Sequence, residues 1–334
     1  MGRHVAGDMP GLDRLVDDAC AGIGREIAEL RIPRLWGVVL GGGYGRGEGG
    51  ALIREESGKR EKGNEDAALY NDLDFFAITE EGAPEAETVA SIGAVLKPIS
   101  EKWSAKLGID VDFTVRTPWR IRHDQERLMI QELLRGHCDV AGAKGEELFS
   151  GVEMADVSKL PWMEAARLLM NRGMGLLLAK RKIENRASGE CRDFVNRNIN
   201  KCILGAGDAR LIARHAYAWR AEERAKALGD GLYSAAVEWK FRPGEAPVCD
   251  WEKAREVWLE ALEEVSCGSG SSRDSRNSRS VRNAVRWLVR RRSVGDLRTF
   301  ALDPVVRVLE SVARRVRDRG AIDDALTRDW QVFN

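Results

Sequence analysis

Two stretches of the sequence combine residue types that can bind a phosphate and a metal ion. The first, VVLGGGYGRGEGG at 38–50, carries an apolar segment into seven glycines and one arginine. The second, LYNDLDFFAIT at 69–79, places Asp72 and Asp74 at alternate positions of an apolar segment. A glycine-rich turn after a strand lets backbone N–H groups approach an anion, and a following helix adds the positive end of its dipole. The first stretch therefore favours phosphate binding.

The aspartates point to a metal ion. Residues i and i+2 of a strand lie on the same face, so the carboxylates of Asp72 and Asp74 converge. Two like charges so close together are costly unless a cation lies between them. Mg²⁺ prefers oxygen ligands and bridges to substrate phosphates. Asp110 and Asp112 repeat the spacing on a later segment, and either of them could bring a third carboxylate to the same point.

Each motif also has a plainer interpretation. The glycines could form a tight turn without a ligand, and Gly45, Gly47 and Gly50 also satisfy the GxGxxG spacing of a dinucleotide-binding fold. An edge strand can carry aspartates that discourage aggregation. That explanation suits one pair of aspartates, but it accounts poorly for two pairs beside a phosphate-binding turn.

Hydrophobic periodicity predicts the elements that must position these residues. Their order is a helix at 11–30, a strand at 35–40, the glycine turn, a strand at 73–78, a helix at 89–107 that Gly108 ends, and a strand at 109–115. This order is typical of a small α/β sheet domain. Farther along the chain the periodicity is mostly helical, with one long helix expected at 193–228.

The predicted fold class is α+β, with a small mixed-sheet domain followed by a helical bundle domain. We expect an N-terminal helix at 1–30, a catalytic domain at 31–120, a helical domain at 121–265, a flexible linker at 266–280 and C-terminal helices at 281–334.

Composition limits the classes of function. Of the 334 residues 43% are apolar, which is enough for a core in each of two domains. Lys plus Arg equals Asp plus Glu at 53 each, so net charge gives no general attraction to nucleic acid or to a membrane. The six cysteines have no CxxC spacing, and no apolar run approaches the roughly 20 residues that cross a bilayer. We expect a cytoplasmic protein without a membrane partner.

The motifs, in this order, resemble the nucleotidyltransferase superfamily typified by DNA polymerase β and the aminoglycoside nucleotidyltransferases. LGGGYGRGE supplies Gly42, Gly43, Arg46 and Gly47, NDLDFF supplies Asp72 and Asp74, and VDF supplies Asp112. Two departures from the family pattern matter. Gly43 stands where many members have a phosphate-binding serine, which shifts that contact to backbone amides. The charged interval 54–66 lengthens the gap before Asp72, which implies a mobile loop over the site.

The resemblance implies a magnesium-dependent transfer of a nucleoside monophosphate, with ATP as the favoured donor, to a hydroxyl acceptor. Pyrophosphate would be released. Asp72, Asp74 and Asp112 would be the catalytic residues and the ligands of two Mg²⁺ ions, one of which carries the triphosphate while the other lowers the pKa of the acceptor hydroxyl. Asp112 could also act as the base, and Asp110 remains its rival as the third carboxylate.

The implied nucleotide-binding residues are Gly42, Gly43, Arg46 and Gly47 in the glycine turn and Lys201 in the helical region. Amides of the turn would hold the β and γ phosphates, while Arg46 would neutralise charge or support the turn. NKCILGAGDARLIARHAYAWRAEER at 200–224 is similar to the helix that follows the catalytic domain in several bacterial nucleotidyltransferases. Lys201 and Asp208 are two turns apart there, so Lys201 could reach the triphosphate. A solvated charge pair on a surface helix explains the same spacing.

The acceptor stays open among a small hydroxylated molecule, a protein side chain and an RNA end. Eight arginines against one acid between Arg273 and Arg292 could contact RNA, or could belong to a linker and a solvated helix face.

Two other functions compete with nucleotidyl transfer. A catalytically silent nucleotide-binding or antitoxin-like module of the same fold would have no need of three acids beside anionic phosphate. An NAD(P)-dependent oxidoreductase, built on the GxGxxG spacing, would need an acidic residue that closes the next strand, whereas the acidic doublet stands at the other end of that strand.

Overall fold

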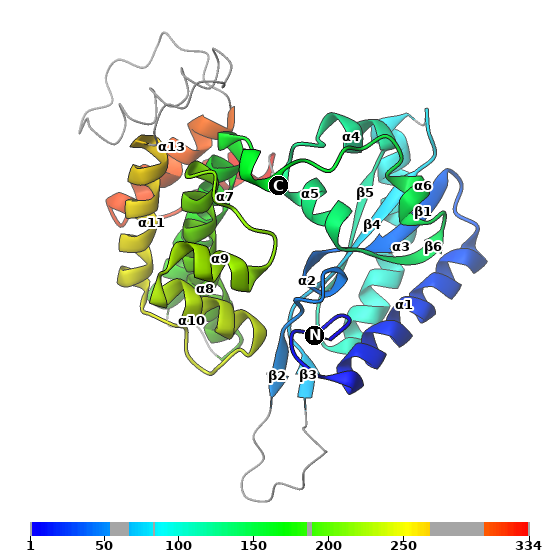
Figure 1. The fold of residues 1–334 in the computed structure, drawn as a ribbon, viewed down its shortest axis with the longest axis horizontal. Coiled ribbons are helices and arrows are strands. Elements are labelled where there is room, and N and C mark those ends of the chain that lie inside the picture. Colours follow the sequence, from blue (N-terminus) through cyan, green and yellow to red (C-terminus); the bar gives the residue numbers. More distant parts are fainter. Residues whose placement is uncertain (1, 54–66, 83, 186–188, 268–303, 333–334) are drawn as a thin grey trace, which may run out of the picture. The chain divides into compact units, whose positions relative to one another are not determined.

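The computed structural model describes residues 2–53, 67–82, 84–185, 189–267 and 304–332 of the chain (Figure 1). Contacts divide the chain into two compact units, the first comprising Met1–Ala155 and Lys240–Pro243 and the second comprising Asp156–Trp239 and Gly244–Asn334. The first unit combines helices with a small mixed sheet, while the elements of the second are helical wherever the structure describes it. The fold is therefore mixed α/β, in agreement with the predicted class.

The first unit is built from short strands and helices of very different lengths. In chain order they are α1 (Pro10–Leu30), β1 (Leu35–Leu40), α2 (Gly42–Gly45), β2 (Ala51–Ile53), β3 (Ala67–Leu69), β4 (Leu73–Thr79), α3 (Glu85–Leu107), β5 (Val111–Arg116), α4 (Pro118–His123), α5 (Leu128–Arg135), β6 (Cys138–Gly142) and α6 (Gly145–Leu148). Gly108 ends α3 in the left-handed conformation with φ 70°, as its position after the apolar stripe predicts.

The main sheet has the strand order β5-β4-β1-β6. β1 is antiparallel to both β4 and β6, whereas β4 and β5 are parallel. β2 and β3 form a separate antiparallel pair. β4 is therefore an interior strand, and β5 lies at an edge.

Two cores cover the two faces of this sheet because successive strand residues point in opposite directions. Buried residues of α1 and α3 pack on one face, which includes Val38, Leu40, Leu73 and Phe75. Buried residues of α4, α5 and α6 pack on the other face, which includes Val39, Phe76 and Ile78. Burial of apolar side chains on both faces of the sheet thus holds the strands and helices of the first unit together.

The described part of the second unit consists of helices of 8 to 25 residues and one short 3₁₀ turn. Its elements are a 3₁₀ turn η1 (Val157–Lys159), α7 (Trp162–Glu184), α8 (Gly189–Ala213), α9 (Ala221–Leu228), α10 (Gly231–Phe241), α11 (Trp251–Cys267), α13 (Pro304–Arg317) and α14 (Asp324–Gln331). Three buried tryptophans fix its core, since the indole N–H groups of Trp162, Trp251 and Trp258 donate to backbone carbonyls at 2.8–3.0 Å. The last two residues of α10 belong to the first unit.

The domain boundary differs from the one expected at residue 120. The first unit continues to Ala155 because β6 pairs with β1, and because Ile130 and Leu133 of α5 complete the second face of the sheet. The helix expected at 1–30 also packs into this unit rather than forming a separate part.

The helical region differs from expectation in two places. The helix expected at 193–228 is divided into α8 and α9, and His215 between them has a left-handed backbone with φ 57°. Ser266 and Cys267, the first residues of the expected linker, belong to α11. The rest of that linker, the segment from Arg273 to Arg292 and the interval 54–66 lie outside the described residues.

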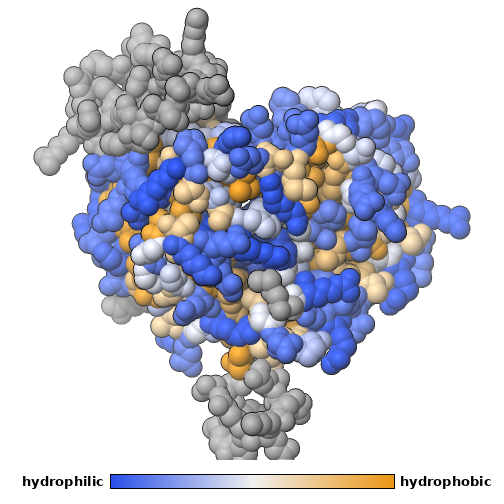
Figure 2. Space-filling view, in the orientation of Figure 1, coloured by the Kyte–Doolittle hydropathy of each residue, from blue (hydrophilic) through white to orange (hydrophobic). Residues whose placement is uncertain are grey.

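Hydrophilic residues predominate on the molecular face drawn in Figure 2, with apolar residues scattered among them. Over the described ranges, every helix falls short of the length or apolar character that a bilayer span requires.

Candidate active site

The parallel pairing of β4 with β5 brings two predicted metal ligands together. Its register makes Asp74 and Asp112 direct partners. Neighbouring strands lie about 5 Å apart, so the two side chains leave adjacent points on one face of the sheet. Farther along that face Phe76 and Ile78 are buried, whereas Asp74 is half-buried and Asp112 is exposed. The apolar cover therefore ends where the aspartates begin.

Two further acids lie at the approaches to these strands. Asp72 and Asp110 immediately precede β4 and β5, and the amide of Leu73 donates to the carbonyl of Asp110 at 2.9 Å. The pKa of Asp112 is raised, first by partial desolvation and then by the charges of Asp110 and Asp72. Asp110 and Asp112 are thus both close to the other acids, but Asp112 is the register partner of Asp74.

The chemistry of this donor set fits a hard divalent cation. The donors are carboxylate oxygens, which Mg²⁺ prefers, and a cation would relieve the repulsion that, after desolvation, contributes to the raised pKa of Asp112. Within the described ranges, no three His, Cys, Asp or Glu side chains already form a metal-binding group. The residues that would hold the ion are Asp72, Asp74 and Asp112, with Asp110 beside them.

The glycine turn lies directly against the aspartates. The amide of Gly41 donates to the carbonyl of Asp74 at 2.8 Å where β1 ends. Gly42 has φ 60°, and a Cβ at this position would overlap the carboxylate of Asp74. Only glycine adopts this backbone conformation without strain and permits this close approach. The structure thus brings the predicted phosphate-binding turn and the predicted metal ligands to the same place.

Tyr44 connects the glycine turn by hydrogen bonds to the residues that precede β4. Its side chain is fully buried, and its hydroxyl donates to the carbonyl of Gly50 at 2.8 Å. The same oxygen accepts from the amides of Tyr70 at 3.1 Å and Asn71 at 3.3 Å, directly before Asp72. Sequence reasoning missed this residue, and its only signal was a bulky aromatic among glycines.

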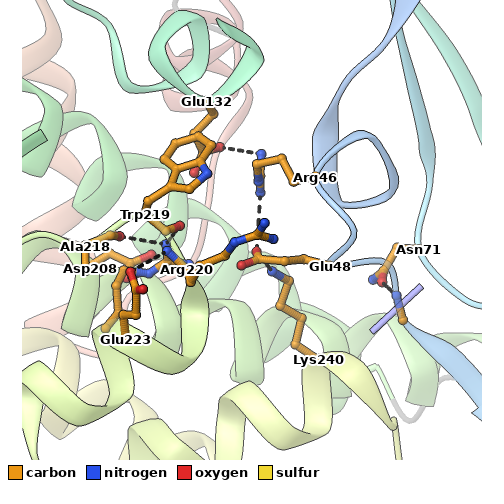
Figure 3. Close-up of polar contacts among 12 residues, drawn as sticks. Arg46, Glu48, Asn71, Glu132, Asp208, Ala218, Trp219, Arg220, Glu223 and Lys240 are labelled. Atoms are coloured by element: carbon orange, nitrogen blue, oxygen red, sulfur yellow. Dashed lines mark hydrogen bonds and ion pairs between the residues drawn. The ribbon is translucent and has the colours of Figure 1, made fainter. Parts of the chain in front are cut away.

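Arg46 belongs to a largely buried group of charges beside the turn (Figure 3). Its Nη1 donates to Oε2 of Glu132 at 3.0 Å, and its Nη2 lies 3.9 Å from Oε2 of Glu48. Glu48 is 3% exposed and also accepts from Nζ of Lys240 at 2.9 Å. These contacts support the turn, which was one of the two roles expected for Arg46. Contact of Arg46 with phosphate stays a prediction.

Gly43 and Gly47 shape the rest of the turn. The carbonyl of Gly43 accepts from the amide of Glu48 at 2.8 Å. Gly47 has φ 73°, and a Cβ there would meet the carbonyl oxygens of Gly2 and Arg3 at 3.2 and 3.3 Å. Gly47 therefore has a packing reason to be glycine.

Lys201 belongs to the second unit, where it lies exposed on α8. Asp208 is in a different environment, because its carboxylate contacts Nε of Arg224 at 2.9 Å and accepts from the hydroxyl of Tyr233 at 2.5 Å. The two residues therefore do not share one environment on the helix. A contact between Lys201 and a triphosphate remains a prediction.

The geometry weighs against two of the plainer interpretations. β4 lies between β5 and β1, so protection of a sheet edge does not explain Asp74. A dinucleotide-binding unit joins parallel strands through a helix. Here the strand before the glycines is antiparallel to β4, and the glycines lead into the four-residue helix α2.

Comparison of the chain with models of known protein families gives no match, and comparison with curated proteins gives none either.

Proposed function

We propose that this protein is a magnesium-dependent nucleotidyltransferase that moves a nucleoside monophosphate, AMP being favoured, from a triphosphate to a hydroxyl acceptor. The observation that carries the proposal is the register pairing of Asp74 with Asp112, beside a glycine turn whose Gly42 contacts Asp74. On this proposal the mixed-sheet unit is the catalytic domain. The protein would act in the cytoplasm. The helical unit would help to bind the nucleotide and the acceptor.

Each residue then has a chemical task. Asp72, Asp74 and Asp112 supply the oxygens for two Mg²⁺ ions, which when bound would neutralise the triphosphate and lower the pKa of the acceptor hydroxyl. Asp112 can accept the proton of that hydroxyl as the general base, because the register places it beside Asp74 at the proposed site. The hydroxyl oxygen attacks the α-phosphorus in line, the bond to the bridging oxygen breaks, and pyrophosphate leaves with the turn amides around its oxygens.

Transfer of a label tests the proposal. Triphosphates labelled at the α-phosphate are incubated with the full chain, Mg²⁺ and a cell extract, which is then separated into metabolites, protein and RNA. We expect a labelled acceptor in one fraction with the native chain, and a loss of at least about a hundredfold, near 3 kcal/mol, with Asp74→Asn. Glu101→Gln is the matched control, because Glu101 is an exposed acid on α3 of the same unit. Equal labelling by the native chain and Asp74→Asn would refute the assignment.

Thermal unfolding separates this function from its two rivals. The chain is heated with ATP, GTP, CTP, UTP or NAD, each with and without Mg²⁺. Stabilisation by a triphosphate only when Mg²⁺ is present supports a metal-dependent nucleotide site. The same stabilisation without any label transfer indicates the silent binding module, and stabilisation by NAD without metal indicates the oxidoreductase.

A further inference from the structure

Residues 2–7 are built into the glycine turn. The amide of Gly49 donates to the carbonyl of His4 at 3.0 Å, and the amide of Ala6 donates to the carbonyl of Gly49 at 2.9 Å. On its other side this segment is held by α1, because Asp13 accepts from the amides of His4 at 2.8 Å and Val5 at 2.9 Å. The segment therefore joins α1 to the turn.

The side chain of His4 is buried between two acceptors. It is 1% exposed, its Nδ1 lies 3.2 Å from the carbonyl oxygen of Tyr44, and its Nε2 lies 3.0 Å from Oδ1 of Asp17. A backbone carbonyl and a carboxylate can only accept hydrogen bonds. Both ring nitrogens must therefore carry hydrogen for both contacts to be favourable. The geometry selects the imidazolium form of His4.

The carboxylates that face His4 favour the same form. Asp17 and Asp13 both lie on α1, while the guanidinium of Arg3, which pairs with Asp17 at 2.9 Å, acts in the opposite direction. The sulfur of Cys138 on β6 lies 4.0 Å from Nδ1 of His4. Burial alone would lower the pKa of His4, but its contacts with Cys138, Asp17 and the Tyr44 carbonyl raise it to about 9. A histidine whose pKa is raised on folding contributes its full stabilisation below pH 6.5 and loses it as pH rises through about 9.

His4 is linked to the metal ligands through one residue. Its ring holds the carbonyl of Tyr44, whose hydroxyl holds the amides of Tyr70 and Asn71 directly before Asp72. Loss of the contact between His4 and Tyr44 would therefore increase the mobility of both the glycine turn and the residues directly before Asp72.

We propose that protonated His4 is a positioning residue of the nucleotide site, which fixes the glycine turn and Asp72 through Tyr44. The nucleotide part of this inference rests on the proposed function. The structural part, that protonated His4 fixes the glycine turn and Asp72 through Tyr44, does not depend on the proposed function. An experiment can therefore refute either part without refuting the other.

Hydrogen exchange of the full chain tests the structural part. In His4→Gln we expect the amides of Gly49, Tyr70 and Asn71 to exchange at least about tenfold faster, with α7 and α11 unchanged. Asp17→Asn is the milder variant, because it keeps the ring and removes its carboxylate partner. Asp18→Asn, an exposed acid on the same helix, is the matched control and should behave like the native chain. Unchanged exchange at the turn in both His4→Gln and Asp17→Asn would overturn the proposal.

A pH series of ATP binding in the presence of Mg²⁺ tests the nucleotide part. We expect the affinity of the native chain and of Asp18→Asn to fall at least about tenfold as pH rises through 9. His4→Gln should bind weakly at pH 7 and show no further fall. Native and His4→Gln profiles that coincide would overturn the role in positioning. Absence of binding of ATP, GTP, CTP and UTP by the native chain, with the exchange result intact, would instead reject the proposed function.

Discussion

Two acidic residues, one in each unit of this protein, have opposite electrostatic surroundings. In the first unit, partial desolvation and then the charges of Asp110 and Asp72 raise the pKa of Asp112. In the second, Glu264 accepts from Nε of Arg210 at 2.8 Å and Nε of Arg214 at 2.5 Å, and its pKa is lowered although burial alone would raise it.

Asp208 is a second acid of the second unit that is paired with an arginine, and it is more buried than Glu264. Its carboxylate and the guanidinium of Arg224 are 14% and 7% exposed, and the hydroxyl of Tyr233 hydrogen-bonds both. In the second unit Asp208 and Glu264 are thus matched with arginine. Asp112 is instead repelled by the charges of Asp110 and Asp72, a cost that a bound cation would offset. The difference separates a structural cluster from one that is suited to a ligand.

The largest effect on stability is expected from Arg224→Met. Removing the guanidinium leaves the buried carboxylate of Asp208 without its cation, which we expect to cost about 3–5 kcal/mol in free energy of unfolding. Chemical denaturation of the full chain measures this loss. Lys226→Met removes a charge from an exposed position of the same helix and should change the free energy by less than about 0.5 kcal/mol. Similar losses in the two variants would show that the contact of Arg224 with Asp208 contributes no more than an exposed charge does.

A smaller effect of opposite sign is expected from Asp112→Asn. The amide keeps the shape of the carboxylate and removes its repulsion with Asp72 and Asp110, so in metal-free buffer the free energy of unfolding should rise by roughly 0.2–1 kcal/mol. Because folding raises the pKa of Asp112, its ionisation lowers stability as pH rises above about 4. The gain should therefore be present at pH 7 and absent at pH 3.

Glu101→Gln provides the comparison for this smaller effect, since Glu101 faces Lys97 at 3.9 Å rather than other acids. A metal-free Asp112→Asn chain that is less stable than Glu101→Gln at pH 7 would show that Asp112 is a structural acid.

The elements around the site were predictable because their signals are local. The alternation along β4 and the apolar stripe of α3 each fix an element from its own residues, and the i, i+2 spacing of Asp72 and Asp74 fixes their common face. β6 was missed because CDVAG has only five residues and none of them is fully buried. The strand is ordered by its pairing with β1. That pairing extends the first unit beyond residue 120.

The supports of the site were not predictable because they are distant in sequence. Glu132 and Lys240 contact Arg46 and Glu48 across 86 and 192 positions. No local pattern encodes such partners. His4 had no partner suggested by the sequence, since Asp17 and Tyr44 meet it only once α1 and the glycine turn are folded together.

Binding of a divalent cation is the most direct test of the central claim. Mn²⁺ replaces Mg²⁺ at oxygen-ligand sites and can be followed by the magnetic resonance signal of the free ion during titration of the full chain. We expect Mg²⁺ to displace it, Asp74→Asn and Asp112→Asn each to weaken Mn²⁺ binding at least about tenfold, and Glu101→Gln to leave it unchanged. Equal Mn²⁺ binding by the native chain and all three variants would contradict the account.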